Sequence, residues 1–99
     1  MKSVANIIAE ELKKNKINDL FMLTGYGAMY LNDAIEKAKI NFYAARNEAA
    51  APMMASAYAK NNNKIGAVCV TAGPGATNAL PGLAEAYVDS SPIIILSGQ

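Results

Sequence analysis

Hydrophobic and polar positions follow alternating helical and strand patterns along the whole chain. Apolar residues recur at helical spacing at Val4, Ile7, Ile8 and Leu12, and Ser3 precedes them as a candidate N-cap. The same reasoning predicts strands at residues 19–23, 40–44, 65–71 and 93–96, and further helices at 29–38, 48–60 and 77–89. Helices that alternate with strands indicate an α/β fold, a parallel sheet with helices on both faces, in three αβα layers. We expect one domain over residues 1–99.

Glycine, proline and asparagine mark the boundaries between these elements. Residues 24–27 and 72–76 are predicted as glycine-rich turns, and residues 61–63 as a polar turn. The paired Gly25 and Gly27 are expected to take backbone angles that other residues avoid. Asn47 is a candidate cap for the third helix. Pro52 fits that helix if it begins close to Ala49, so that the proline falls in the first turn, and otherwise predicts a kink.

Composition excludes several classes of function. Lys and Arg number 9 against 8 acidic residues, so a net charge of +1 gives no electrostatic reason for binding nucleic acid or an anionic membrane. The apolar runs are too short to cross a bilayer and the N-terminus does not resemble a signal peptide, which predicts a cytoplasmic protein. Without histidine there is no His-based triad or zinc site, and a single cysteine, Cys69, allows no internal disulfide. Cys69 is expected to be a buried strand thiol, and the scattered acidic residues predict no metal site.

Candidate chemistry gathers where the predicted strands end. Ligands of open parallel sheets bind outside the carboxyl ends of the strands, and two glycine-rich loops and Glu48 fall there. A dinucleotide site is disfavoured, because Tyr30 stands where the third glycine of that fingerprint would be. The loop Gly73-Pro74-Gly75 also lacks the Lys-Ser/Thr ending of a phosphate loop. A site for another kind of small molecule is therefore expected.

Four motifs in order carry a more specific resemblance. They are Gly25-Tyr26-Gly27-Ala28, Arg46-Asn47-Glu48-Ala49-Ala50-Ala51, Val70-Thr71-Ala72-Gly73-Pro74-Gly75-Ala76-Thr77-Asn78-Ala79, and Ala86-Tyr87-Val88-Asp89-Ser90-Ser91-Pro92 through Ser97-Gly98-Gln99. With this order and spacing, the chain from Ser3 onward resembles the N-terminal pyrimidine-binding domain of thiamine-diphosphate enzymes of the acetolactate synthase and pyruvate decarboxylase family. The resemblance implies a parent enzyme that is a carboligase or decarboxylase, a transferase or lyase, acting on a 2-oxo acid such as pyruvate.

The resemblance implies a catalytic role for Glu48. The glutamate at this position hydrogen-bonds a ring nitrogen of the cofactor's aminopyrimidine and favours its imino tautomer, whose nitrogen can then take the proton from the thiazolium carbon. A protonated carboxyl group can donate that hydrogen bond, and the small apolar neighbours of Glu48 suit the uncharged form. Taken without the motifs around it, Glu48 could instead be an acid that complements a helix dipole.

The resemblance also implies cofactor-binding and substrate residues. The cofactor-binding set is Gly25, Tyr26, Glu48, Gly73, Pro74, Gly75 and Asn78, of which the Gly-Pro-Gly loop and Asn78 also help form the subunit interface. Alternatively, that loop is a plain strand–helix turn with Asn78 as a cap. Tyr26 stands where relatives have a small residue or an acid, so it could narrow the substrate pocket or donate a hydrogen bond, and Gln99 lies near the substrate end. The pattern over residues 27–34 resembles relatives from surface-sugar loci, which leaves the substrate open.

Partners and further cofactors follow from the same resemblance. The active site lies between two subunits, which implies a homo-oligomer, at least a dimer. A separate domain with a Gly-Asp-Gly…Asn motif, absent from this chain, binds the diphosphate and Mg²⁺, and FAD is a further cofactor that the resemblance allows. Because the chain stops directly after a strand, we expect a truncated domain, inactive alone, with uncovered apolar surfaces that self-associate. The alternative is a non-catalytic interaction or regulatory module that pairs with a complete subunit.

Overall fold

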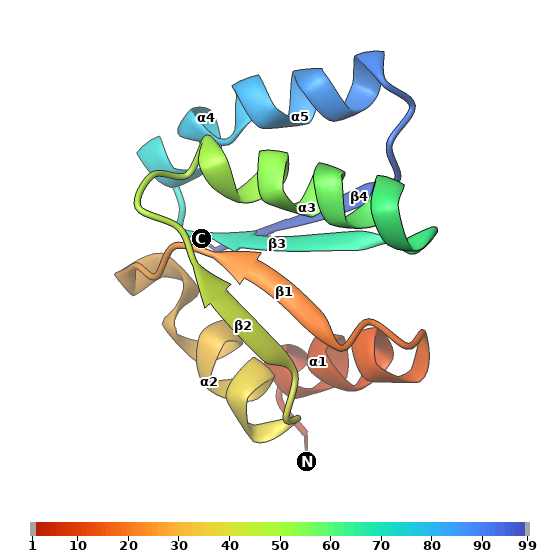
Figure 1. The fold of residues 1–99 in the computed structure, drawn as a ribbon. Coiled ribbons are helices and arrows are strands. Elements are labelled where there is room, and N and C mark those ends of the chain that lie inside the picture. The colour runs from red at the N-terminus through yellow and green to blue at the C-terminus, as the bar shows by residue number, and fades with distance from the viewer. Residues whose placement is uncertain (1, 99) are drawn as a thin grey trace.

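A four-stranded parallel sheet lies at the centre of the computed structural model, which describes residues 2–98. The strands β1 (Asp19–Met22), β2 (Asn41–Ala44), β3 (Gly66–Val70) and β4 (Ile93–Ser97) are ordered β2-β1-β3-β4. The helices are α1 (Val4–Lys14), α2 (Met29–Lys37), α3 (Ala50–Asn62), α4 (Pro74–Asn78) and α5 (Leu80–Val88), with a 3-10 turn η1 (Tyr26–Ala28). In Figure 1, α1 and α2 cover one face and α3 and α5 the other. The predicted three-layer α/β fold is confirmed.

Each face of the sheet has its own hydrophobic core. Leu20 and Met22 of β1 pack with α1 and α2, whereas Phe21 between them packs with α3, as the alternation of side chains along a strand requires. All five residues of the central strand β3 are buried, which confirms the expected burial on both faces. The sheet is thus held from both sides, and its ends are free to carry loops.

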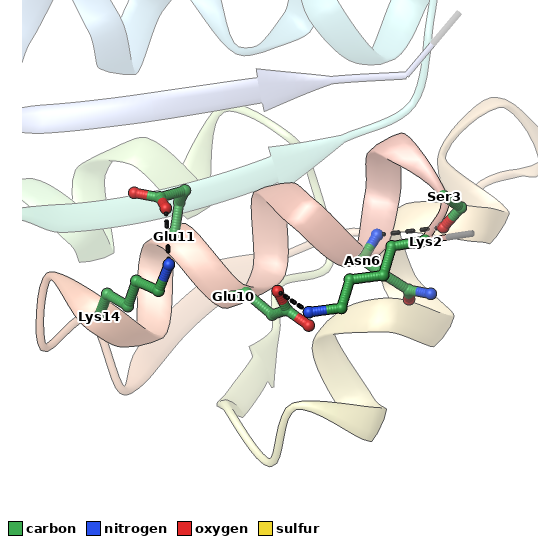
Figure 2. A network of polar contacts seen from close by, with 6 residues as sticks. All are labelled: Lys2, Ser3, Asn6, Glu10, Glu11 and Lys14. Carbon is green, nitrogen blue, oxygen red and sulfur yellow. Dashed lines mark hydrogen bonds and ion pairs between the residues drawn. The ribbon is translucent and has the colours of Figure 1, made fainter.

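The first helix begins and is capped as the sequence predicts. Ser3 accepts a hydrogen bond from the Asn6 amide at 3.2 Å, and the ion pairs Lys2–Glu10 (3.0 Å) and Lys14–Glu11 (3.3 Å) lie along the exposed side of α1 (Figure 2). The cap satisfies one of the amides that have no partner within a helix, whereas exposed ion pairs of this kind contribute little.

The third helix differs from the prediction at both ends. It begins at Ala50, two residues later than expected, because residues 47–49 form a turn in which the Asn47 side chain accepts from the Ala49 amide at 2.8 Å. Glu48 therefore lies in that turn. Pro52 falls in the first helical turn, as required for an unkinked start. The predicted polar turn at 61–63 is wrong, since the helix continues to Asn62 and only Asn63 turns left-handed, with φ 52°.

The segment after β3 also departs from the prediction. Instead of a loop over 72–76 and one helix from 77, the short α4 begins at Pro74 and α5 follows after Ala79. Pro74 suits a first helical position because its missing N–H would have no partner there. Pro81 cannot donate to the Thr77 carbonyl four residues earlier, so a continuous helix is interrupted between them.

Several apolar surfaces remain uncovered within residues 2–98. Strands β2 and β4 form the two edges of the sheet. A cavity of about 660 Å³ is an apolar groove between α1 and β4 that includes Ile7, Ile8 and Ile94. On α5, Leu80, Leu83, Tyr87 and Val88 face solvent. The expected uncovered surfaces are present, and the self-association that they would promote stays a prediction.

Candidate functional site

The chain leaves β1 and β3, which are neighbours, toward opposite faces of the sheet. After β1 it enters η1 and α2 on one face, and after β3 it enters α4 and α5 on the other (Figure 1). In open parallel sheets such a divergence marks a switch point at the carboxyl ends of the strands, here called the crevice, and ligands of this fold class bind there. The groove beside α1 and β4 lies elsewhere and is lined almost wholly by apolar side chains. The candidate functional side chains are therefore those at the crevice between β1 and β3.

Two loops meet at Thr71, directly after β3. The Gly27 amide donates to the Thr71 Oγ1 at 3.0 Å. A Cβ added to Gly25 would lie 2.5 Å from the Thr71 Cβ, and one added to Gly75 would lie 2.7 Å from its Cγ2. The glycines are thus needed for close approach to the threonine side chain. The sequence analysis included Thr71 in a motif but assigned it no role. Its role becomes visible only when β1 and β3 are known to be neighbours.

The prediction that Gly25 and Gly27 take unusual backbone angles is wrong. Gly25 has an extended backbone with φ −168°, and among residues 2–98 the one glycine with a positive φ is Gly73, at 65°. Gly25 and Gly27 serve close packing and not an unusual turn angle. Gly73 is exposed and has open space around its Cα, so its backbone can be approached from solvent.

Glu48 lies on the same rim, on the α3 side of the crevice. Its half-buried side chain accepts a hydrogen bond through Oε2 from the Asn78 Nδ2 at 3.3 Å, across 30 residues of sequence. A Cβ added to Gly75 would lie 3.8 Å from Glu48 Oε1. The structure thus brings Glu48, Gly75 and Asn78 together. The alternative of Asn78 as a helix cap is wrong, because Asn78 is the last residue of α4 and Ala79 precedes α5.

The other predicted site residues lie further out on the rim. Tyr26 begins η1, its side chain is 89% exposed, and its hydroxyl makes no hydrogen bond with residues 2–98. Pro74 is the exposed first residue of α4. The end of β4 reaches the same rim, since the Gly98 amide donates to the Val70 carbonyl at 3.0 Å and a Cβ at Gly98 would overlap the Gly27 carbonyl. Gln99, the predicted substrate residue, lies outside the described residues.

The ionisable chemistry of this crevice rests on Glu48. Within residues 2–98 no three His, Cys, Asp or Glu side chains are grouped as a metal site. Cys69 lies at the end of β3, where burial raises the pKa of its thiol to about 11 and its Sγ lies 3.4 Å from the Asn32 Oδ1. This confirms the expected buried thiol, which is suited to packing and not to nucleophilic attack. Among the described residues, none of the helices combines the length and apolar character needed to cross a membrane.

Comparison with known proteins identifies the family of the chain. The model of the family "Thiamine pyrophosphate enzyme, N-terminal TPP binding domain" matches residues 2–99. The acetolactate synthase large subunits of Buchnera aphidicola (from Schizaphis graminum) and Lactococcus lactis are each 40% identical over 98 residues, covering 98% of this chain and 17% of the relative. The large subunit of acetolactate synthase isozyme 3 of Escherichia coli is 38% identical over 100 residues, again 17% of its length. The chain thus belongs to the thiamine pyrophosphate enzyme family, as an acetolactate synthase-like N-terminal TPP-binding domain.

Proposed function

We propose that this chain is the cofactor-activating segment of a thiamine-diphosphate-dependent enzyme. The proposed parent is an acetolactate synthase-like carboligase or decarboxylase, a transferase or lyase, that acts on a 2-oxo acid such as pyruvate. The observation that carries the proposal is Glu48 at the crevice, where Asn78 donates to one carboxyl oxygen and the other lies beside Gly75 with no hydrogen-bond partner among residues 2–98.

The residues at the crevice fit an aminopyrimidine. Such a ring is flat and offers a ring nitrogen and an exocyclic amino group, which need one carboxyl partner and nearby backbone groups. Glu48 supplies the carboxyl through Oε1, which the Asn78 bond leaves available. Gly73 exposes its backbone without a side chain in the way, and the buried Gly75 lies beside Glu48 Oε1. When bound, thiamine diphosphate supplies a nucleophilic carbon for attack on the 2-oxo acid.

Each residue of the site would then have a distinct task. Asn78 orients the Glu48 carboxyl by donating to Oε2, and Glu48 holds a proton against the ring nitrogen of the pyrimidine. Tyr26, which is exposed on the opposite side of the crevice, narrows the substrate side of the site or donates to the substrate. The same substrate side is proposed for Gln99. A substrate from surface-sugar biosynthesis would enter by this side too.

The whole protein is proposed to work as a homo-oligomer, at least a dimer, with the active site between two subunits. The exposed apolar face of α5 supports an interface, since Tyr87 is 86% and Val88 79% exposed. We propose that another domain of the parent protein binds the diphosphate and Mg²⁺, that FAD is a further cofactor to test for, and that the protein is cytoplasmic. Its partner is then a small-molecule 2-oxo acid, with neither nucleic acid nor a membrane involved.

Calorimetry with thiamine diphosphate and Mg²⁺ tests this proposal. The proteins are the 99-residue chain and the longest natural protein that contains it, each as wild type, Glu48→Gln and Glu36→Gln. Glu36 is an exposed acid on α2, so its variant makes the same chemical change away from the site. We expect Glu48→Gln alone to abolish turnover of pyruvate and to weaken binding by at least about tenfold, since it removes a carboxyl that contacts the ligand. Equal effects of the two variants would contradict the proposal.

A non-catalytic interaction module is the second candidate, and the exposed apolar faces of α5 and of the α1–β4 groove favour it. Such a module would bind a complete thiamine-diphosphate enzyme subunit through these faces and would not need Glu48. The two functions separate when Glu48→Gln is tested in both assays. An interaction module would retain partner binding in the variant and would bind no cofactor in the wild type.

A further inference from the structure

The structure assigns Thr71 as a positioning residue that couples the loop carrying Tyr26 to the loop beside Glu48. This inference rests on the proposed function, because it concerns how the substrate and cofactor sides of that site are held in register. Thr71 stands directly after β3, at the carboxyl end of the sheet, and its side chain is half-buried between the two loops.

The hydroxyl group of Thr71 fixes the first loop. Its Oγ1 accepts the Gly27 amide at 3.0 Å, and its Cβ fills the space that a side chain at Gly25 would need. Gly25 and Gly27 are the residues on either side of Tyr26. The backbone before and after Tyr26 is therefore held by one threonine, which limits where the exposed tyrosine side chain can lie.

The methyl group of Thr71 fixes the second loop. A Cβ at Gly75 would lie 2.7 Å from the Thr71 Cγ2 and 3.8 Å from Glu48 Oε1, so Gly75 is packed between the methyl group and the carboxyl. How closely the first turn of α4 approaches Glu48 is thus limited by Thr71. Since one side chain touches both loops, displacement of either loop is transmitted to the other.

The two contacts can be removed separately. Thr71→Val keeps the branched shape and both methyl-sized groups but loses the acceptor for Gly27, whereas Thr71→Ser keeps the acceptor and loses the methyl group, which lies beside both Gly75 and Gly25. Amide hydrogen exchange, followed by NMR in the 99-residue chain, reports the Gly27 bond directly. The amide of Val68 in the buried strand β3 reports global stability and serves as the reference.

We expect Thr71→Val to speed Gly27 exchange about tenfold relative to Val68, and Thr71→Ser to leave that ratio within about threefold of wild type. A purely structural role would speed both amides together in either variant. If Thr71→Val leaves the ratio unchanged, the inference is overturned. If Thr71→Val does not fold, the test is the temperature dependence of the Gly27 amide proton shift in wild type. We expect the small temperature coefficient of a hydrogen-bonded amide. A large coefficient, typical of an amide exposed to water, would overturn the inference.

Thiamine binding, titrated with thiamine alone, separates this inference from the proposed function. We expect both variants to bind thiamine more weakly than wild type. Only Thr71→Val should speed exchange of the Gly27 amide relative to Val68. If wild type binds no thiamine while Thr71→Val still frees Gly27, the proposed function fails for this chain and the positioning of the Tyr26 loop stands. If binding is intact in both variants, the coupling to the cofactor side is overturned.

Discussion

Two carboxylates at opposite ends of the sheet, Asp19 and Glu48, differ in how fully they are hydrogen-bonded. Asp19 opens β1 and accepts from Asn41 (3.3 Å) and Tyr43 (3.1 Å) through Oδ1 and from Tyr58 (3.1 Å) through Oδ2. Glu48, beyond the carboxyl end of β2, has one side-chain donor, Asn78. A carboxylate with both oxygens hydrogen-bonded within the protein stabilises the fold. One with an oxygen that has no partner in the protein can bind a ligand.

The surroundings of the two groups differ in the same sense. Around Asp19, Phe21 stacks on Tyr43 with ring centroids 5.5 Å apart and meets Tyr58 edge-on at 5.8 Å. These contacts tie the edge strand β2 and the helix α3 to β1. Around Glu48 the neighbours are the side-chain amide of Asn78 and the small residue Gly75, and no aromatic pair of residues 2–98 lies there. The contacts around Asp19 stabilise the amino end of the sheet, and we propose that the carboxyl end binds the ligand.

Glycine substitutions at the two ends of the sheet should differ most in how much they lower the free energy of unfolding. A Cβ at Gly66, where β3 begins, would overlap the backbone carbonyl of Ala55, which cannot move away without shifting α3. We expect Gly66→Ala to lower the free energy of unfolding by about 3 kcal/mol. Gly75→Ala meets the movable Thr71 methyl and should cost about 1 kcal/mol, while weakening thiamine binding. Urea denaturation measures both, and equal losses of stability would contradict the contrast.

Neutralising the two carboxylates should separate stability from binding. Asp19→Asn weakens three hydrogen bonds to a charged acceptor, so we expect it to lower the free energy of unfolding by about 2 kcal/mol. Glu48→Gln should change stability by no more than about 0.5 kcal/mol. The measurement is urea denaturation at neutral pH with binding checked on the same samples. A large loss of stability in Glu48→Gln would show that Glu48 is structural as well.

The tyrosines around Asp19 predict a dependence on alkaline pH. Hydrogen bonding to Asp19 raises the pKa of the Tyr43 hydroxyl above its ordinary 10.0, and burial followed by the same hydrogen bond raises the pKa of Tyr58. Because the folded state favours the neutral phenols, their contribution to stability is present below pH 10.0 and is lost as the pH rises through the raised values. Ultraviolet titration should show the pKa of Tyr43 falling toward 10.0 in Asp19→Asn. An unchanged titration would contradict the contact.

The smallest effects are expected from the two asparagines. Asn78→Ala removes the donor to Glu48 and Asn41→Ala a donor to Asp19, both across exposed 3.3 Å bonds. Each should change the free energy of unfolding by no more than about 0.5 kcal/mol. Only Asn78→Ala should weaken thiamine binding, by about threefold to tenfold, because the Glu48 carboxyl loses its orientation. If the two variants bind thiamine equally well, Asn78 has no role in the binding site.

Local patterns were sufficient to predict much of this molecule. Apolar spacing predicted every strand within two residues at each end, and Ser3 predicted the first helix start. The rim followed from parallel topology, since successive strands end at one edge. Where a single residue competes with a pattern, prediction failed: Pro81 interrupts the helix expected over 77–89.

Contacts between distant segments could not be predicted. Asp19 meets partners 22, 24 and 39 residues away, and nothing near it in sequence indicates them. The role of Thr71 likewise depends on β1 lying beside β3, which places Gly25 and Gly27 against its side chain. For the same reason, unusual backbone angles were predicted for these two glycines. What excludes a side chain at both positions is instead the nearby side chain of Thr71.

Chemical-shift mapping of the chain during titration with thiamine diphosphate and Mg²⁺ tests the central claim most directly. We predict that the largest shifts fall on the backbone amides of Glu48, Gly73, Gly75 and Asn78 at the carboxyl end of the sheet, with Asp19 and Tyr43 at the other end unmoved. Shifts centred on Asp19 or on the α1–β4 groove would contradict the assignment of Glu48 as the ligand-binding carboxylate.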